Sequence, residues 1–189
     1  MMRIADLKEG DILGASRRCS IWKPATWLAW RIKTTTGSPW SHVGLLSWSQ
    51  TDGRWQVIEA LWGGGVVIRD LRAAYWAYDG DLAVARLVEP INGLTQRTIT
   101  TWARMQVGRP YNRQAILQIR ALQIVLGAGA VGSIMAPDLN PRQEFICSGL
   151  VGTAYRLAEF PLAGVGDFAG PAAIMRSPSV EVQPLLRHV

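Results

Sequence analysis

The chain has 189 residues, 49% of them hydrophobic, and a formal net charge of +6. That length and apolar content suffice for a complete core, which excludes a disordered or fibrous protein and favours one domain over residues 1–189. The basic residues are scattered rather than gathered in a block, so no nucleic acid is expected as a partner. The charge instead favours an anionic cell-wall polymer or a membrane surface.

The N-terminal residues 1–13 include acidic side chains and no apolar run of signal-peptide length. We therefore expect no N-terminal signal peptide and a cytoplasmic or phage-associated protein. Gly10 and Asp11 predict a turn into a first short strand. Pro24 suits the first position of a helix over residues 25–33.

Residues 41–46 and 54–60 have strand character, and Asp52-Gly53 between them indicates a hairpin turn. A hairpin with its tip near residues 50 and 51 would put His42 directly opposite Glu59. A carboxylate in that position can hold the imidazole in one tautomer and stabilise its cation. Three of the nine tryptophans flank this hairpin, and we expect these three to line a groove: Trp40, Trp48 and Trp62.

The triple glycine at residues 63–65 predicts a bend, and it is no phosphate loop because no Gly-Lys-Ser/Thr ending follows. Strands are predicted at residues 66–68 and 82–88, and a helix at residues 95–107 that stops at Gly108-Arg109-Pro110. This order predicts an α+β fold in which a small antiparallel sheet or partial barrel packs against helices.

Residues 115–136 are apolar enough to raise the question of a membrane span, although polar residues and three glycines interrupt them. We expect residues 113–140 to form a helical or loop insertion near the active site, either packed over the domain or acting as a lid. Membrane contact through residues 115–136 is the alternative. The sequence does not define an oligomeric state.

Cys147 opens an apolar run with helical spacing, so it is expected at a helix N-terminus. There the macrodipole and the unpaired N–H groups favour the nucleophilic thiolate and can also receive an oxyanion. Of the two histidines, His188 lies at a chain end, so His42 is the better candidate for the base. A buried structural thiol is the alternative for Cys147. No disulfide between Cys19 and Cys147 is expected, because it would consume the candidate nucleophile. No metal site is expected either, because no pair of possible ligands has metal-type spacing, and no cofactor is expected.

Five segments, in order, resemble the NlpC-type superfamily of papain-like cysteine hydrolases, specifically its circularly permuted, YiiX-like branch. They are Gly10-Asp11-Ile12-Leu13, Ser41-His42-Val43-Gly44, Ile58-Glu59-Ala60, Gly108-Arg109-Pro110-Tyr111 and Cys147-Ser148-Gly149-Leu150-Val151. Unpermuted relatives have the cysteine before its histidine, whereas here the base must come from upstream, as His42 does.

The resemblance implies a permuted papain-like domain with Cys147 as nucleophile, His42 as general base and then acid, and Glu59 as the orienting group. It also places Tyr111 near the cysteine, where Tyr111 and Ser148 are the candidates to contact substrate or the oxyanion. The implied activity is hydrolysis of an amide bond through a Cys147 thioester, with a peptide or peptidoglycan-like substrate from bacterial cell wall.

The chain departs from the family pattern in two places. Asn112 stands where an acidic residue is frequent, and residues 113–140 exceed the length found in compact members. Two other functions therefore stay open. One is a lipid acyltransferase or thioesterase of the permuted papain-like type, and the other is a catalytically idle structural or phage virion module.

Overall fold

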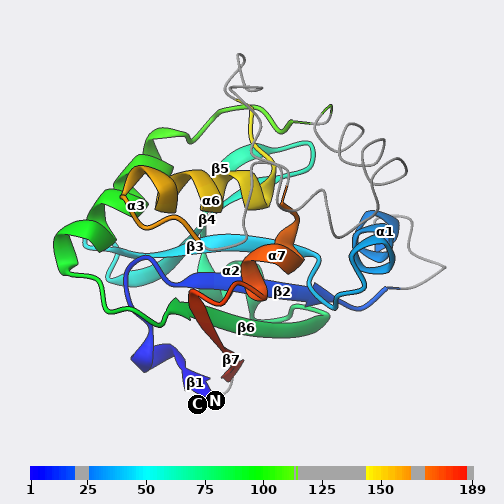
Figure 1. The fold of residues 1–189 in the computed structure, drawn as a ribbon, viewed down its shortest axis with the longest axis horizontal. Coiled ribbons are helices and arrows are strands. Elements are labelled where there is room, and N and C mark those ends of the chain that lie inside the picture. The colour runs from blue at the N-terminus through cyan, green and yellow to red at the C-terminus, as the bar shows by residue number, and fades with distance from the viewer. Residues whose placement is uncertain (20–25, 113, 115–143, 163–168, 187–189) are drawn as a thin grey trace.

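The computed structural model describes residues 1–19, 26–112, 114, 144–162 and 169–186. Its centre is one sheet with the strand order β1-β7-β6-β2-β3-β4-β5 (Figure 1). All neighbouring strands are antiparallel except β1 and β7, which are parallel. The sheet is thus mixed and open rather than purely antiparallel. The strands are β1 (Met2–Arg3), β2 (Ile12–Arg17), β3 (His42–Ser49), β4 (Arg54–Leu61), β5 (Gly65–Asp70), β6 (Gly80–Leu87) and β7 (Val180–Leu186).

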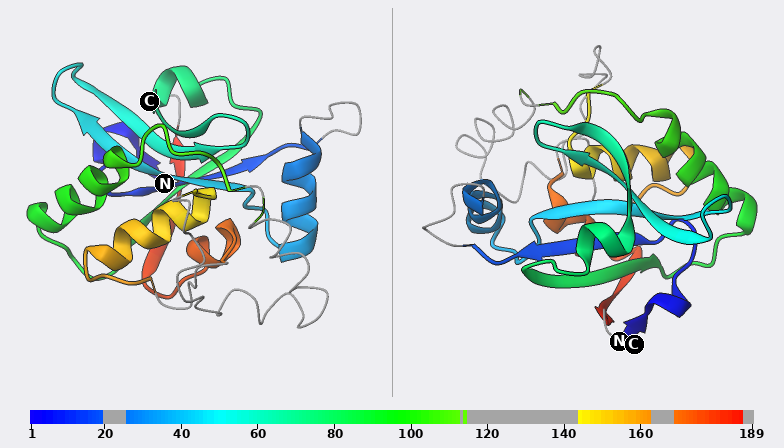
Figure 2. Two further views of the ribbon diagram at one scale, coloured as in Figure 1. Left: turned by 90° about the horizontal axis from the view of Figure 1, so that it is seen from above. Right: turned by 180° about the vertical axis from the view of Figure 1, so that it is seen from behind.

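Helices cover both faces of this sheet, and β1 and β7, the first and last strands, lie side by side at one edge (Figures 1 and 2). Helices α3, α6 and α7 pack on one face, α2 packs on the other, and α1 stands beside the sheet (Figure 2). The described helices are the 3-10 turn η1 (Ile4–Asp6), α1 (Trp27–Thr36), α2 (Leu71–Tyr75), α3 (Gly93–Met105), α6 (Cys147–Leu157) and α7 (Pro171–Met175).

The two helical layers create two cores, and β3 and β4 contribute to both because successive side chains point to opposite faces. Val43 and Ile58 join the core beneath α6, together with Leu150. Leu46 and Val57 join the core beneath α2. Burial on both faces explains why these strands are apolar along most of their length.

Several expected elements are confirmed with shifted ends. The helix expected over residues 25–33 is α1, two residues later at its start, while Pro24 lies outside the described residues. The helix expected over residues 95–107 is α3, which Asn92 caps by accepting a hydrogen bond from the Thr95 N–H at 2.9 Å. The expected insertion at residues 113–140 falls, except for Gln114, outside the described residues. Within the described part of the chain, no helix has the length and apolar character needed to cross a bilayer.

Candidate active site

The sheet divides at one end of the β3–β4 hairpin. Pairing of β3 with β4 runs only as far as Leu45 and Ile58. Beyond that point β3 continues along β2 as far as His42, and β4 continues along β5 as far as Leu61. The N-terminus of α6 lies at this division, since Cys147 lines one cavity with His42 of β3 and with Ala60 and Leu61 of β4. A helix from one face of the sheet can therefore meet side chains that belong to the other face.

The hairpin register differs from the expected one by two residues. Trp48 pairs with Trp55, so the turn lies one residue later than predicted. Continued along the strands, this register places Gly44 rather than His42 opposite Glu59. A Cβ on Gly44 would lie 2.7 Å from Val57 Cγ2, so glycine permits the close approach of β4. Because the shift is an even number of residues, His42 stays on the same face as Glu59 and becomes its diagonal neighbour.

Glu59 is fully buried and accepts three hydrogen bonds, with one further ion-pair contact. Its Oε1 accepts from Arg69 Nε at 2.7 Å and lies 2.6 Å from Arg69 Nη2. Its Oε2 accepts from the Tyr75 hydroxyl at 2.6 Å and from His42 Nε2 at 2.5 Å. Both oxygens of the carboxylate are therefore engaged by neighbouring donor groups. Since Nε2 is hydrogen-bonded to Glu59, Nδ1 is the ring nitrogen that remains available to Cys147.

These contacts fix the charge state of the carboxylate. Burial raises the pKa of Glu59. The hydrogen bond and charge of His42, the hydrogen bond of Tyr75 and the charge of Arg69 together outweigh burial and lower the pKa of Glu59 below the usual 4.5. Burial and the Glu59 charge raise the pKa of Tyr75 well above 10, so its hydroxyl remains a donor. Glu59 is consequently an anion near neutral pH.

Cys147 and His42 shift each other's pKa in opposite directions. Burial lowers the pKa of His42, but hydrogen bonding to Cys147 and the charges of Cys147 and Glu59 outweigh it and raise that pKa to about 10. Burial raises the pKa of Cys147, but His42 and the backbone of Val43 and Ser148 outweigh it and lower that pKa. The favoured state near neutral pH is therefore a thiolate beside an imidazolium.

Arg69 and Tyr75 were not identified from the sequence. Arg69 was one charge in an apolar strand, and Tyr75 followed it in a segment with no helix prediction. The β4–β5 register and the five-residue helix α2 bring both to Glu59. No sequence pattern predicts either contact unless the strand register is already known.

Replacing Tyr75 by phenylalanine is expected to lower the free energy of unfolding by about 1.5–3 kcal/mol, because the hydrogen bond it removes has a charged acceptor. Urea denaturation would measure the change. Tyr155→Phe is the matched control, since the Tyr155 hydroxyl donates to the neutral Gly10 carbonyl at 2.6 Å. A smaller loss in Tyr75→Phe than in Tyr155→Phe would contradict this account of Glu59.

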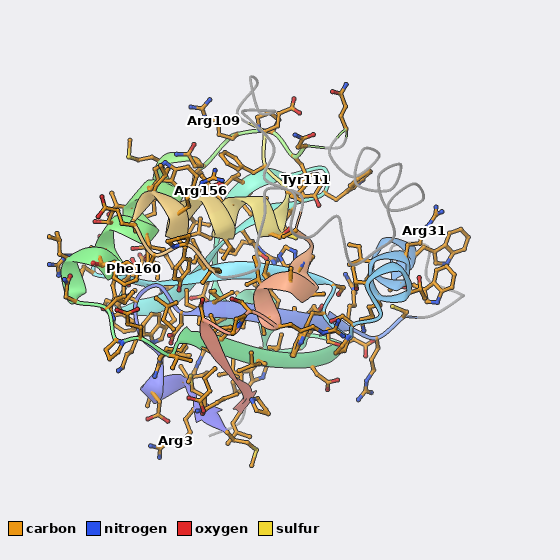
Figure 3. The ribbon with its side chains drawn as sticks, in the orientation of Figure 1. Arg3, Arg31, Arg109, Tyr111, Arg156 and Phe160 are labelled. Atoms are coloured by element: carbon orange, nitrogen blue, oxygen red, sulfur yellow. The ribbon has the colours of Figure 1, made fainter. Side chains whose placement is uncertain are left out.

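Tyr111 reaches the site through a contact between two loops. Gly65 has φ +70°, and a Cβ there would lie 2.3 Å from the Arg109 carbonyl oxygen, so only glycine fits. Val66 N–H then donates to that carbonyl at 2.8 Å, which holds the segment before Tyr111. Tyr111 lies near the N-terminal end of α6 (Figure 3), and its ring meets Trp62 edge-to-face with 5.6 Å between centroids. Burial and the Cys147 charge raise the Tyr111 pKa, so its hydroxyl stays protonated.

The remaining candidate residues have different surroundings. The Ser148 side chain is buried, its Oγ has no hydrogen-bond partner among the described residues, and it does not line the cavity described below. Trp48 lines a separate cavity of about 630 Å³ at the hairpin end, whereas Trp40 packs against the core. Cys19 and Cys147 are both free thiols, Cys19 exposed and Cys147 buried. His188 lies outside the described residues.

A cavity of about 740 Å³ opens over Cys147 and His42. Its walls come from α1, β2, the separated ends of β3 and β4, and α2, with Trp62 and Tyr111 on one side. The cavity is large enough for part of a peptide or an acyl group. Its lining residues are Arg17, Ala29, Ile32, Ser41, His42, Ala60, Leu61, Trp62, Arg69, Ala74, Tyr75, Tyr78, Tyr111 and Cys147.

An α+β fold in which a cysteine at a helix start meets a histidine from a sheet strand is of the papain-like type. Over 93% of this chain and 96% of the other, with a TM-score of 0.62 and 19% sequence identity, the structure is similar to that of the metalloprotein YiiX from Escherichia coli O157:H7. The chain therefore has a YiiX-like fold. No family model matches the sequence, and no curated protein is significantly similar to it.

The description of YiiX as a metalloprotein prompts the question of whether this site suits a metal ion. Both oxygens of Glu59 are already hydrogen-bonded, to Arg69 on one side and to Tyr75 and His42 on the other. Cys147 and His42 alone are two ligands, fewer than a protein zinc site uses. The described residues include no group of three or more potential ligands, so this donor set does not fit a metal centre.

Proposed function

We propose that this protein is a cysteine hydrolase that cleaves an amide bond through a thioester on Cys147, in the manner of permuted NlpC-type enzymes. The observation that carries the proposal is that Cys147 and His42 line one cavity and shift each other's pKa, while His42 Nε2 is hydrogen-bonded to Glu59 at 2.5 Å. It provides a nucleophile, a base and an orienting carboxylate in that order. Peptide cross-bridges or stem peptides of bacterial cell wall are the proposed substrates, on the family resemblance.

In the first half-reaction the Cys147 thiolate attacks the carbonyl carbon, a C–S bond forms and the carbonyl oxygen becomes an oxyanion. The Cys147 backbone N–H at the start of α6 and the protonated Tyr111 hydroxyl are the proposed donors to that oxyanion. The His42 imidazolium then gives its proton to the nitrogen as the C–N bond breaks. The amine leaves and a thioester remains on Cys147.

The second half-reaction uses the same groups in reverse. Neutral His42 takes a proton from water, and the resulting hydroxide adds to the thioester carbonyl. The C–S bond breaks, which releases a carboxylic acid and restores the thiolate–imidazolium pair. Glu59 stabilises the cationic form of His42 in both steps through the hydrogen bond to Nε2.

Hydrolysis should depend on pH in two limbs. Activity should appear at a pH below the ordinary thiol pKa of about 8.5, because the Cys147 pKa is lowered. It should fall as pH rises through about 10, where His42 loses the proton that the leaving amine needs. Release of new amino groups from purified peptidoglycan across this range is the measurement, with Cys147→Ala as the inactive control. Release that is equal in Cys147→Ala would overturn the proposal.

Lipid acyl transfer or thioester hydrolysis is the second candidate, and helix α1 is the observation that favours it. Ala29 and Ile32 of α1 line the cavity, while Trp27 and Trp30 are each 55% exposed on the same helix. Tryptophan is enriched where a protein meets the lipid–water interface. Release of free fatty acid from phospholipid vesicles, with no new amino groups from peptidoglycan, would select this function over amide hydrolysis.

A further inference from the structure

The charged side chains of the active-site cavity leave one positive charge without a counterion. The Cys147 thiolate and the His42 imidazolium neutralise each other, and Arg69 forms an ion pair with Glu59. Arg17 also lines the cavity, but its guanidinium forms no hydrogen bond or ion pair with any described residue. Arg17 is exposed to solvent and is therefore accessible to a ligand.

The register of β2 shows where this charge lies. Ala15 is the residue opposite His42, and Arg17 follows two positions later on the same strand. Side chains two residues apart share a face, so Arg17 projects on the His42 side of the sheet, about 7 Å further along β2. The Arg17 backbone N–H donates to the Ser41 hydroxyl at 3.4 Å, which ties this end of β2 to the residue before His42.

The surroundings of Arg17 include one further cation, since Lys33 Nζ donates to the Arg17 carbonyl at 2.6 Å, and otherwise uncharged side chains. Ala29, Ile32 and Ala74 supply apolar surface to the same cavity. Burial raises the pKa of Tyr78 to about 12 despite the opposing charge of Arg17, so Tyr78 is a neutral neighbour. Beside such apolar surface a guanidinium attracts an anionic group more strongly than it would in bulk water.

We propose that Arg17 forms an anion-binding subsite within the active-site cavity and that it recognises a carboxylate of the substrate beside the bond attacked by Cys147. Guanidinium groups bind carboxylates through two parallel hydrogen bonds. A carboxylate matches the single uncompensated charge among the residues that line the cavity, whereas a phosphate group carries nearly two. The substrate class is therefore an amide with a free carboxylate near the scissile bond, as at the end of a short peptide. The inference rests on the proposed role of Cys147 as the nucleophile.

Affinity labelling tests the subsite without requiring turnover. The probes are N-bromoacetyl derivatives of glycine, 4-aminobutanoate and 6-aminohexanoate, each compared with its neutral primary amide. The Cys147 thiolate displaces bromide, so a C–S bond replaces the C–Br bond and bromide leaves. Mass spectrometry of the Cys147 peptide gives the rates, in a Cys19→Ala background that removes the exposed thiol. At least one acid should react about tenfold faster than its amide, as a charge-assisted hydrogen bond supports.

Arg17→Met should abolish this preference, so that the acid and the amide of each probe length react with Cys147 at equal rates. Arg17→Lys should retain part of it, because the charge remains but the forked geometry is lost. Arg18→Met is the matched control, since Arg18 is an exposed neighbour that does not line the cavity, and it should keep the full preference.

Two results would overturn the subsite. One is an acid-to-amide ratio near one for every probe length in the parent protein, and the other is an equal loss in Arg17→Met and Arg18→Met. A matched aminoalkylphosphonate probe that reacts faster than the carboxylates would overturn the assignment to a carboxylate. Failure of the proposed catalytic role is distinguishable, because iodoacetamide itself would then label Cys147 no faster than a free thiol.

Discussion

Replacing His42 by alanine is expected to slow alkylation of Cys147 by iodoacetamide at pH 7 by at least about thirtyfold. His42 is the main cause of the lowered pKa of Cys147, and burial opposes it. Without the imidazole, burial should carry that pKa to or above the ordinary value of about 8.5, at which only about 3% of a thiol is ionised at pH 7. The N–H groups near the sulfur remain but carry no full charge.

The measurement is the rate of Cys147 labelling between pH 4 and pH 10, with Cys19 replaced by alanine. The parent protein should show a midpoint well below 8.5, and His42→Ala should show one at or above it. His188→Ala is the matched control because it removes the other histidine of the chain, and its profile should follow the parent. A parent midpoint near 8.5 would contradict the ion pair and favour a structural or binding module.

Amide hydrolysis should suffer more than alkylation in the same variant. Alkylation needs only the thiolate, whereas hydrolysis also needs a proton for the leaving amine and a base for the attacking water. Removing acid–base catalysis of this kind costs about 10²–10⁴-fold in rate. A larger loss in turnover than in labelling would therefore separate the two roles of His42.

The central residues of the site could be predicted because their chemistry is scarce in the chain. With two cysteines and two histidines, a helix-start cysteine and a strand histidine leave few pairings to consider. Glu59 could be predicted as well, because a register shifted by two residues keeps it on the His42 face as a diagonal neighbour. The error of two residues in the hairpin register did not remove the contact.

Arg69 and Tyr75 could not be predicted, because their contacts depend on facts that the local sequence does not encode. Arg69 lies two residues beyond the position opposite Glu59, and that depends on where the bend before β5 ends. Strands β1 and β7 were missed for a similar reason. β1 has two residues, and β7 includes Glu181, Gln183 and Pro184, so neither has the apolar alternation typical of a strand.

The division of the sheet reconciles two requirements that conflict in an unbroken sheet. Cys147 belongs to the core beneath α6, whereas the face of β4 that carries Glu59 also carries Val57, which packs beneath α2. In a continuous sheet the β3–β4 backbone would separate these layers. Because β3 and β4 part after Leu45, the first turn of α6 reaches across, and an orienting network built on one face can act on a nucleophile supported by the other.

The variant Glu59→Gln should lower the free energy of unfolding by about 3 kcal/mol at pH 7. Removing one partner of a buried ion pair costs about 3–5 kcal/mol, and the lower end applies because the Arg69 side chain is 38% exposed and can hydrate its freed charge. The glutamine also turns an N–H₂ group toward donors, which leaves at least one of them unpaired. Since Glu59 supports the His42 cation, the His42 pKa should fall below about 10 in this variant.

The stability difference should depend on pH with a defined sign. The folded-state pKa of Glu59 is lowered below 4.5, so its contribution is complete above about 4.5 and disappears as pH falls through the folded pKa. Urea denaturation between pH 3 and pH 8 should therefore show the two proteins converging only in acid. Asp6→Asn, at a fully exposed carboxylate paired with Arg3, should leave the pH 7 urea midpoint unchanged.

A double variant tests whether the loss comes from the network itself. Glu59→Gln combined with Arg69→Met removes both charges, so the pair should cost less than the sum of the two single losses. Strict additivity, or a Glu59→Gln loss that persists unchanged down to pH 3, would show that burial of the site does not depend on an ionised Glu59. Such a result would contradict the claim that an ionised Glu59 orients His42 and stabilises its cationic form.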